Sequence, residues 1–389
     1  MNNRVNIHPK GWQALHCLLL LVITGCLTIL LSQTASAQQL KPGFDAREYL
    51  DMLSMDFLTA DTPWTNKQIS IPENAQLVYR SPETGLYNRW DLWIRDDKTA
   101  VIIIRGTVGN KESWMENFFA GMIPATGQLQ LNDSTNFKYK LAKDERAYVH
   151  AGWTLALASM APDIVAHIKT CYQQGIRDFL ISGHSQGGAI SFLLRSYLQY
   201  LEEPGFPKNI TYKTYCSAAP KPGNLYYAYD FDFITGNGWG FRIVNVRDWV
   251  PETPFSIQTT RDFNTPNPFM NVKGALKKQN IFVRLVIGSM YNKLDRSTKR
   301  ASRRMQKMLG KRLARLVKKS VPGYVPPPFT ESHNYSPAGT PIILYPDAAY
   351  DSKHVFDGKN IFIHHMYAPY REMVKSIYQS SISEKASDR

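Results

Sequence analysis

The sequence predicts an α/β protein in which helices flank a central, mostly parallel β-sheet. Val101–Ile104 are four consecutive β-branched residues, which suit a strand covered on both faces. A second apolar run, Phe179–Ile181, has strand length, and apolar residues of helical period follow it from Ile190 onward. With 389 residues and 43% hydrophobic content, the chain can bury a large core in one or two domains.

The remaining segments extend this pattern along the chain. Asp45 can cap a helix that runs through Tyr49 and Leu53. Lys359–Ile363 is interpreted as the last strand, and apolar residues at Tyr370, Met373, Val374 and Ile377 predict a C-terminal helix after it. Further strand signals, in chain order, are found at Gln76–Arg80, Arg89–Arg95, Ala100–Arg105, Phe241–Val246 and Pro341–Tyr345.

A serine stands at the turn between the second strand and its helix. Gly183-His184-Ser185-Gln186-Gly187 has the Gly-x-Ser-x-Gly spacing of a nucleophile elbow, the strand–turn–helix unit of alpha/beta-hydrolases. Any side chain at Gly183 or Gly187 would clash where strand and helix converge, and the serine itself takes a strained backbone conformation. The helix N-terminus directs free N–H groups toward a developing oxyanion. We therefore predict that Ser185 is a nucleophile, with an acid and a histidine base later in the chain.

Five segments in the right order resemble the class 3 (fungal-type) lipases. Ala219-Pro220-Lys221-Pro222-Gly223-Asn224 fits the family's Gly-x-Pro-x-x-Gly-Asn only loosely, since alanine replaces the first glycine and one residue is missing before the proline. The other four segments are Arg105-Gly106-Thr107 followed by Trp114, Val149-His150-Ala151-Gly152-Trp153, the elbow with Gly188, and Val244-Asn245-Val246-Arg247-Asp248-Trp249-Val250-Pro251. The resemblance covers less than half of the chain.

This resemblance implies a single alpha/beta-hydrolase domain over residues 38–389 that hydrolyses carboxylic esters, as a lipase cleaving acylglycerols through an acyl-enzyme. It assigns Ser185 as the nucleophile and Asp248 as the carboxylate. Oxyanion donors are expected from the backbone N–H groups of Gln186 and Thr107, and the Thr107 hydroxyl is a further possible donor. No metal or cofactor is expected, since no clustered ligand spacing is present. Phospholipase A1 activity on anionic lipids and an inactive lipid-binding relative are the alternatives.

The base is expected near the C-terminus, where two adjacent histidines occur. His364-x-x-Tyr367 resembles the family's His-x-x-Tyr pattern, whereas the spacing to Tyr370 and Val374 favours His365 about as well. The sequence does not separate them, and His333 and His354 are lesser alternatives. His150 and His184 precede Asp248; we expect the first to be structural and the second to point away from the catalytic face.

A basic insertion separates Asp248 from these histidines. Lys273 to Lys319 contains sixteen lysines and arginines and one acid, Asp295, whereas the whole chain has a net charge of +14. The rest of the chain is therefore close to neutral. Ile281–Leu294 predicts one helix, and Ser297 is expected to cap a second one that ends before Pro322. We expect a cap-like insertion at about 256–341 that shields the pocket, lies on an anionic membrane, or both; nucleic-acid binding is the poorer interpretation because no binding module accompanies the charge.

The first 37 residues have the pattern of a secretory signal peptide. Arg4 and Lys10 precede an apolar run from Ala14 to Leu31, and Ala35-Ser36-Ala37 follows as a cleavage site. Ile23-Thr24-Gly25-Cys26 resembles a bacterial lipobox, so lipid anchoring at Cys26 is a less favoured alternative to secretion. A transmembrane anchor is the other alternative. Cys171 and Cys216 remain in the mature chain and are expected to be buried small hydrophobes and not a disulfide framework.

Overall fold

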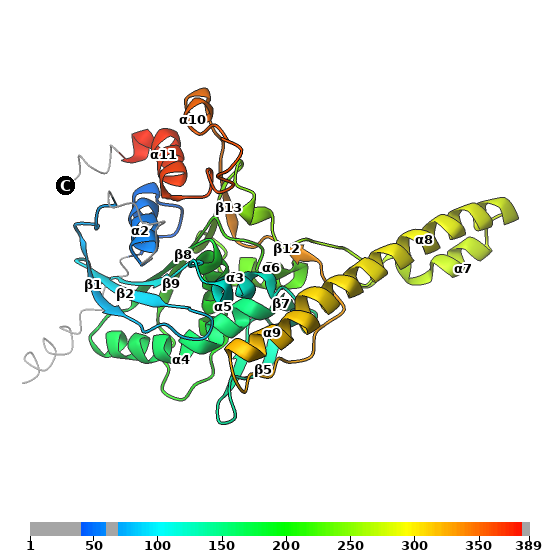
Figure 1. The fold of residues 1–389 in the computed structure, drawn as a ribbon, viewed down its shortest axis with the longest axis horizontal. Coiled ribbons are helices and arrows are strands. Elements are labelled where there is room, and N and C mark those ends of the chain that lie inside the picture. The colour runs from blue at the N-terminus through cyan, green and yellow to red at the C-terminus, as the bar shows by residue number, and fades with distance from the viewer. Residues whose placement is uncertain (1–39, 60–68, 383–389) are drawn as a thin grey trace, which may run out of the picture. The chain divides into compact units, whose positions relative to one another are not determined.

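The computed structural model describes residues 40–59 and 69–382. The predicted signal peptide, its cleavage site and Cys26 lie outside these residues. A seven-stranded sheet forms the centre of the described chain, with the strand order β1-β2-β3-β8-β9-β11-β13 (Figure 1). Its strands are β1 (Ala75–Arg80), β2 (Trp90–Arg95), β3 (Ala100–Ile104), β8 (Asp178–His184), β9 (Thr211–Ser217), β11 (Gly240–Asn245) and β13 (Thr340–Leu344).

The pairing of these strands gives the central, mostly parallel sheet that the sequence predicted. β3, β8, β9, β11 and β13 are parallel neighbours, while β1 and β2 pair antiparallel at one edge. The predicted strand at Val101–Ile104 is β3, which is buried along its whole length. All five residues of β3 pair with β8, from Ala100 opposite Phe179 to Ile104 opposite Gly183. The ends of β3 and β8 therefore meet at one edge of the sheet, and the functional residues follow there.

Helices cover both faces of this sheet, as the sequence predicted (Figure 1). α4 (Ala151–Gln173) and α5 (Gln186–Tyr200) pack on one face in a large apolar cluster. α2 (Ala46–Leu58) and α11 (Tyr367–Ile377) pack on the other face in a second cluster. Asp45 caps α2 as expected, because its carboxylate accepts hydrogen bonds from the backbone N–H groups of Arg47 and Glu48.

Smaller elements surround the sheet. A four-stranded sheet has the order β12-β10-β7-β4, and β5 pairs with β6 in a hairpin. Cys171 and Cys216 are both buried and are not bonded to each other, in agreement with the sequence prediction. The bounds of these elements are α3 (Lys111–Phe118), β4 (Met122–Pro124), β5 (Thr126–Gln130), β6 (Asn136–Lys140), β7 (Tyr148–His150), β10 (Gly223–Asn224), α6 (Leu225–Ile234), η1 (Val250–Glu252), β12 (Tyr335–Ser336) and α10 (Ala348–Lys353).

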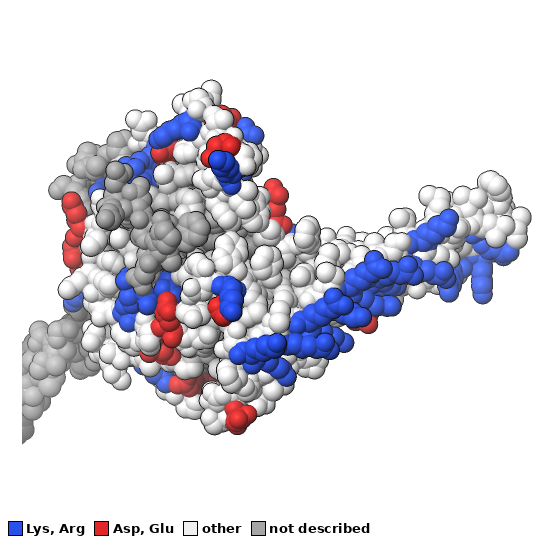
Figure 2. Space-filling model, in the orientation of Figure 1, with Lys and Arg blue, Asp and Glu red and all other residues white. Residues whose placement is uncertain are grey.

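The basic insertion is built differently from the prediction. η2 (Pro268–Asn271) and α7 (Val272–Lys277) lead into α8 (Ile281–Met305), which continues through a π-helical turn, η3 (Gln306–Arg312), into α9 (Leu313–Ser320). Ser297 lies inside α8 and begins no second helix; the cap is Asn280, whose side chain accepts from the Val283 N–H. The basic side chains follow this continuous helix in a stripe (Figure 2). None of the helices in the described residues is long and apolar enough to cross a membrane.

The predicted last strand is also wrong. Residues 359–365 form turns, so β13 is the final strand of the sheet. Asn360 accepts a hydrogen bond from Phe362 through its side chain and from Ile363 through its carbonyl, which curls this segment. His364 and His365 therefore lie on a loop between α10 and α11, and the predicted C-terminal helix is α11.

Candidate active site

Ser185 stands at the sharp turn between β8 and α5. Its φ of 60° and ψ of −126° form a strained conformation that is rare for a residue with a side chain. A Cβ at Gly183 would lie 2.3 Å from the Gly187 carbonyl carbon, and one at Gly187 would lie 2.1 Å from the Ile104 oxygen. Neither position can accept a side chain, because the contacted atoms belong to the backbone. This geometry presents Ser185 at the N-terminus of α5.

Asp248 and His365 form a buried pair beside the elbow. Asp248 follows β11, where its N–H donates to the Asn245 carbonyl across a turn. His365 Nδ1 lies 2.7 Å from Asp248 Oδ2. Because an ionised carboxylate can only accept, His365 holds its proton on Nδ1, which leaves Nε2 free to accept one. The Tyr370 hydroxyl donates to the same carboxylate oxygen at 2.8 Å, and the Val250 N–H donates to the other oxygen at 3.0 Å.

The other C-terminal and insertion histidines have different partners. His364 Nδ1 is 2.9 Å from the Tyr350 hydroxyl on α10, and its carbonyl accepts from Asn245. His354 Nε2 is 2.9 Å from Glu372. His333 is fully buried against Tyr335, and burial lowers its pKa to about 4. Among the histidines left open by the sequence, only His365 contacts Asp248 in the described chain.

His184 supports the loop that holds His365, contrary to the expectation that it points away. Its Nε2 donates to the His365 carbonyl at 2.7 Å, and its Nδ1 is 3.0 Å from the Ser217 hydroxyl. Burial lowers the pKa of His184 well below its ordinary value, and nearby His365 adds to this shift. A neutral His184 is therefore a fixed spacer between β8 and the His365 loop.

His150 is structural, as expected. It caps α4 by accepting from the Trp153 N–H, and its ring stacks on the Trp153 indole with centroids 3.6 Å apart. Its Nε2 lies 3.1 Å from the Asn117 carbonyl, and burial lowers its pKa to about 3. It thus links α3 to α4 and does not contact Ser185.

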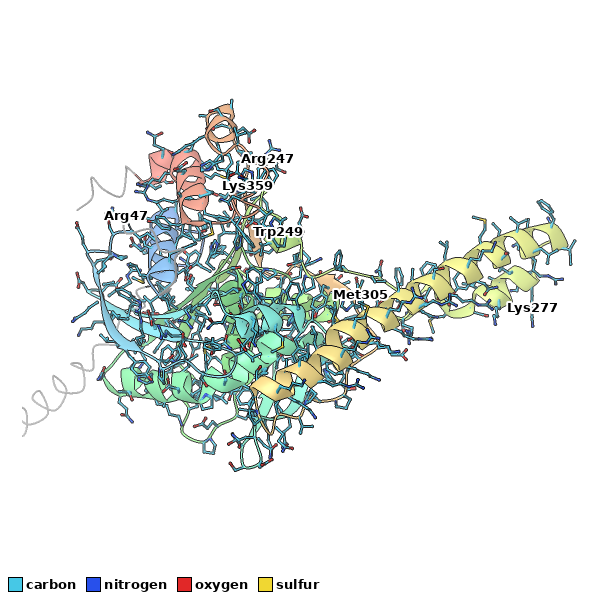
Figure 3. The ribbon with its side chains drawn as sticks, viewed as in Figure 1. Arg47, Arg247, Trp249, Lys277, Met305 and Lys359 are labelled. Atoms are coloured by element: carbon cyan, nitrogen blue, oxygen red, sulfur yellow. The ribbon has the colours of Figure 1, made fainter. Side chains whose placement is uncertain are left out.

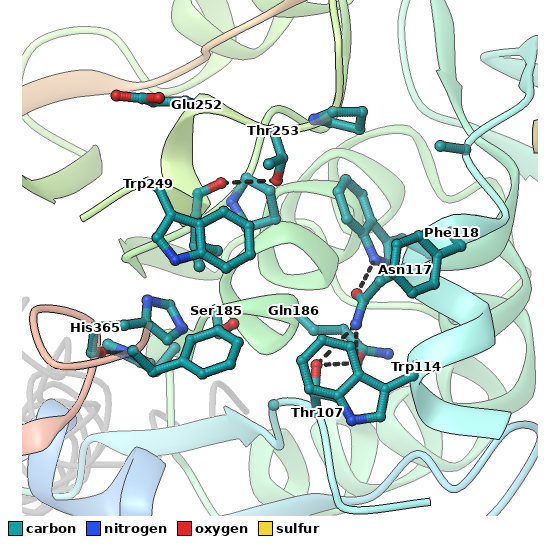
Figure 4. Close-up of a pocket in the computed structure, with 18 of the residues that line it drawn as sticks. Thr107, Trp114, Asn117, Phe118, Ser185, Gln186, Trp249, Glu252, Thr253 and His365 are labelled. Atoms are coloured by element: carbon teal, nitrogen blue, oxygen red, sulfur yellow. Dashed lines mark hydrogen bonds between the residues drawn. The ribbon is translucent and has the colours of Figure 1, made fainter. Parts of the chain in front are cut away.

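Thr107 and Gln186 are joined by their side chains on the opposite side of the elbow. The Thr107 hydroxyl donates to Gln186 Oε1 at 2.7 Å, and Asn117 Nδ2 donates to Thr107 Oγ1 at 2.9 Å (Figure 4). The hydroxyl proton is therefore engaged here, so Thr107 can offer an oxyanion its backbone N–H but not, in this arrangement, its hydroxyl. Trp153 Nε1 donates to Asn117 Oδ1 at 3.1 Å and fixes the amide in turn.

Glu116, which belongs to none of the sequence motifs, completes this network. The carboxyl is fully buried on α3 and accepts from Asn88 Nδ2 at 2.9 Å and from Gln186 Nε2. Burial raises the pKa of Glu116 well above its ordinary value, although both hydrogen bonds oppose the shift. The amide of Gln186 is therefore held from two sides, with its nitrogen toward Glu116 and its oxygen toward Thr107.

A cavity of about 630 Å³ joins these groups. Ser185, His365, Thr107 and Gln186 line it, and most of its other walls are apolar. Figure 4 shows Ser185 between His365 on one side and Thr107 on the other. Large apolar side chains surround this reacting edge: Trp114, Phe118, Trp249, Phe255, Leu309 and Phe362. Such a cavity suits an acyl chain whose carbonyl carbon is presented to the serine.

Part of the chain is similar to known lipases. Residues 101–258 match the family model of lipases, class 3. A curated relative, the secreted mono- and diacylglycerol lipase 1 of Fusarium solani, is 27% identical over 160 residues, which are 40% of this chain and 40% of that protein. The chain therefore spans about two fifths of the length of this relative.

Solved lipase structures are also similar to the chain. The triacylglyceride lipase of Rhizomucor miehei is 20% identical, with a TM-score of 0.40 over 54% of this chain and 76% of the other. A triacylglycerol lipase from Penicillium expansum is 16% identical, with a TM-score of 0.38 over 54% and 74% of the two chains. The segment that matches the class 3 lipase model runs from β3 through the elbow to Asp248 and beyond, so residues 101–258 of this chain are similar to the class 3 lipases.

Proposed function

We propose that the protein is a serine-dependent lipase that hydrolyses acylglycerols, with Ser185, His365 and Asp248 as its catalytic triad. The observation that supports this most directly is the 2.7 Å contact between His365 and Asp248 beside the strained elbow serine. The class 3 lipase match over residues 101–258 and the apolar cavity support the substrate class. An inactive relative would have no need of a nucleophile, base and acid around one cavity.

Each residue of the site has a separate role in ester hydrolysis. The Ser185 oxygen attacks the ester carbonyl carbon while its proton passes to His365 Nε2. Asp248 holds the Nδ1 proton and stabilises the imidazolium. The backbone N–H groups of Gln186 and Thr107 stabilise the oxyanion of the tetrahedral intermediate. When the carbon–oxygen bond breaks, His365 gives the proton to the leaving alkoxide, and a water activated by the same nitrogen then releases the fatty acid.

Serine and histidine substitutions test this assignment. Ser185→Ala and His365→Ala should each lower turnover of a short-chain nitrophenyl ester by roughly three orders of magnitude or more. Exposed Ser134 and the neighbouring His364 offer matched controls, because neither lines the cavity in the described chain. Activity of the Ser185→Ala protein near the wild-type level would contradict the proposal.

Phospholipase A1 activity is the second candidate function, and the basic insertion favours it by attracting anionic headgroups. Comparing hydrolysis of a diacylglycerol with that of a phosphatidylglycerol of equal chain length separates the two. A lipase should prefer the neutral diacylglycerol. Faster cleavage of the phospholipid would show that the protein is a phospholipase and not an acylglycerol lipase, with the same proposed triad.

We also propose that the enzyme is exported by a bacterium and docks on an anionic membrane through residues 273–319. The predicted signal peptide supports export, as does the relative from Fusarium solani, which is a secreted lipase. The lipobox-like Ile23–Cys26 favours a bacterial source. Docking is supported by the sixteen basic residues gathered in one segment of a chain whose remainder is nearly neutral. Each basic residue near such a surface contributes about 1 kcal/mol before screening by salt.

Charge reversal tests the docking separately from the chemistry. The reversed protein should lose binding to anionic vesicles and keep its activity on a soluble ester, since the triad is outside the segment. Salt-independent binding to neutral vesicles would contradict electrostatic docking. The residues to reverse together are Arg303, Arg304, Lys311, Arg312 and Lys318.

A further inference from the structure

The outer part of α8 has few contacts with the rest of the chain. Asp295 accepts a hydrogen bond from Thr260, and Ser302 donates to the Glu331 carbonyl, so the helix is attached to the hydrolase from residue 295 onward. Residues 281–294 precede this attachment and span about 20 Å at 1.5 Å per residue. We call these residues the outer helix. Figure 1 shows α7 beside it and no strand of the sheet near it. Figure 3 shows Lys277, the last residue of α7, near the tip of this projection and Met305, the last residue of α8, nearer the sheet.

The outer helix exposes large apolar side chains. α7 and η2 cover one side of it: Leu276 of α7 lies against Gly288, and the Phe269 ring of η2 stacks on Tyr291 with centroids 6.5 Å apart. When several large apolar side chains are exposed next to one another, they mark a surface that binds a protein or a membrane. Its members are between 41% and 74% exposed: Ile281, Phe282, Leu285, Val286, Ile287, Met290 and Leu294.

The same face of the helix becomes basic nearer the hydrolase. Residues eighteen apart in an α-helix lie five turns apart on one face, about 27 Å along the axis. Four apolar residues of the outer helix each have a basic residue eighteen positions later in the sequence. The pairs are Ile281 with Lys299, Phe282 with Arg300, Leu285 with Arg303, and Val286 with Arg304. One helix face is therefore apolar in its outer part and cationic in its inner part, and Figure 2 shows the inner, basic stripe.

We propose that this face binds an anionic phospholipid bilayer in two parts: the outer helix enters the boundary between headgroups and acyl chains, and the inner stripe binds the headgroup phosphates. The inference rests on the proposed membrane docking and adds a hydrophobic anchor to it. Charge complementarity selects this occupant, because a bilayer surface offers anionic and apolar layers within reach of one helix face. Nucleic acid would leave the apolar half uncovered. A second copy of the chain in parallel would place the two basic stripes against each other.

A polarity-sensitive fluorophore on the outer helix reports insertion directly. Phe282→Cys is labelled in the full chain with Cys17 and Cys26 replaced by serine, since Cys171 and Cys216 are buried. With vesicles containing phosphatidylglycerol, the emission should shift to the blue and rise. Phe233→Cys is the matched control, since Phe233 on α6 is 77% exposed and Phe282 is 74% exposed. Its label should not respond.

The result that overturns the inference differs from the one that overturns docking. If the protein sediments with anionic vesicles in a salt-sensitive manner but the label at residue 282 does not respond, docking stands and insertion is wrong. If the protein does not sediment with them at all, both are wrong, while ester hydrolysis remains an independent test of the triad. A spectral change without vesicles that grows with protein concentration would indicate self-association instead of insertion.

Serine substitutions provide a second measurement. Replacing Phe282, Leu285 and Val286 together by serine should reduce the partition constant for anionic vesicles by about tenfold or more, because binding scales with buried apolar area. Phe233→Ser should leave it unchanged. The triple variant is expected to fold, because these side chains are exposed, and to retain soluble-ester activity. Unchanged partitioning of the triple variant would also overturn the inference.

Discussion

Asp248→Asn is the sharpest test of the proposed triad, because both orientations of the new amide fail. In the first orientation the amide nitrogen takes the place of Oδ2, 2.7 Å from His365 Nδ1. An amide N–H can only donate, so His365 must accept at Nδ1 and carry its proton on Nε2. The imidazole then cannot take the proton of Ser185, and this tautomer is inactive.

In the second orientation the amide oxygen stays near His365, and the amide nitrogen takes the place of Oδ1. There it faces the Val250 N–H, which donates to Oδ1 at 3.0 Å in the native protein. Two buried donors in contact cost about 1–3 kcal/mol, which lowers the share of this orientation by roughly 5- to 150-fold. Loss of the carboxylate charge costs about another 1 kcal/mol when the imidazolium forms.

The two losses together predict that kcat falls roughly 30- to 1,000-fold, while KM for a soluble nitrophenyl ester changes little. Asp351→Asn is the matched control, because Asp351 is 44% exposed and pairs with Arg247 at the surface. Thermal unfolding of both variants checks that the fold is intact. An Asp248→Asn enzyme that kept more than about a tenth of the native kcat would refute the assignment of Asp248.

Three further outcomes are expected. His365→Ala should be as damaging to kcat as loss of the nucleophile and His364→Ala should be mild; equal activity of the two variants would mean that the base lies elsewhere. Thr107→Val should lower kcat only a few-fold, because the hydroxyl that it removes is engaged with Gln186; a loss of about a hundredfold or more would show that the hydroxyl turns to the oxyanion. Burial raises the pKa of the Glu116 carboxyl in the folded protein above its pKa in the unfolded chain. As the pH rises above the pKa of the unfolded chain, the free energy of unfolding therefore falls, by at most about 1.4 kcal/mol per pH unit. Between pH 5 and pH 8, the free energy of unfolding measured in urea should therefore fall more for the wild-type protein than for the Glu116→Gln variant. An equal fall in both proteins would contradict a raised pKa.

The sheet and the elbow could be predicted from sequence because their signals are local. The β-branched run of β3 and the glycines around Ser185 each express a steric demand that a few neighbouring residues reveal. The base could not be chosen in this way. His364 and His365 are adjacent, and the choice depends on Asp248, more than a hundred residues earlier in the chain. Only the turns at 359–365 decide which ring faces it.

The network behind Thr107 was unpredictable for the same reason. Glu116 lies on α3, Gln186 begins α5, and Asn88 precedes β2, so no spacing in the sequence brings them together. The sequence of α3 is mostly polar, as in a helix on the protein surface, so it does not reveal that the Glu116 side chain is buried. The prediction that Ser297 caps a second helix was wrong for another reason. A serine can cap a helix or lie within one, and the i→i+4 pair of Asp295 with Lys299 favours continuation across it.

One helical path connects the basic surface to the catalytic cavity. η3 continues α8 and is docked on the strand after α3: Gly121 N–H donates to the Leu309 carbonyl at 3.1 Å, and Met122 N–H donates to Gln306 Oε1 at 3.0 Å. A Cβ on Gly121 would lie 2.5 Å from Gly310 Cα, so the two backbones are in direct contact. Leu309 itself lines the cavity. Because the helix cannot slide without moving this wall, the proposed contact between α8 and a membrane would fix the orientation of the cavity relative to the lipid. Charge reversal on the helix should therefore reduce hydrolysis of lipid in anionic vesicles far more than hydrolysis of a soluble ester.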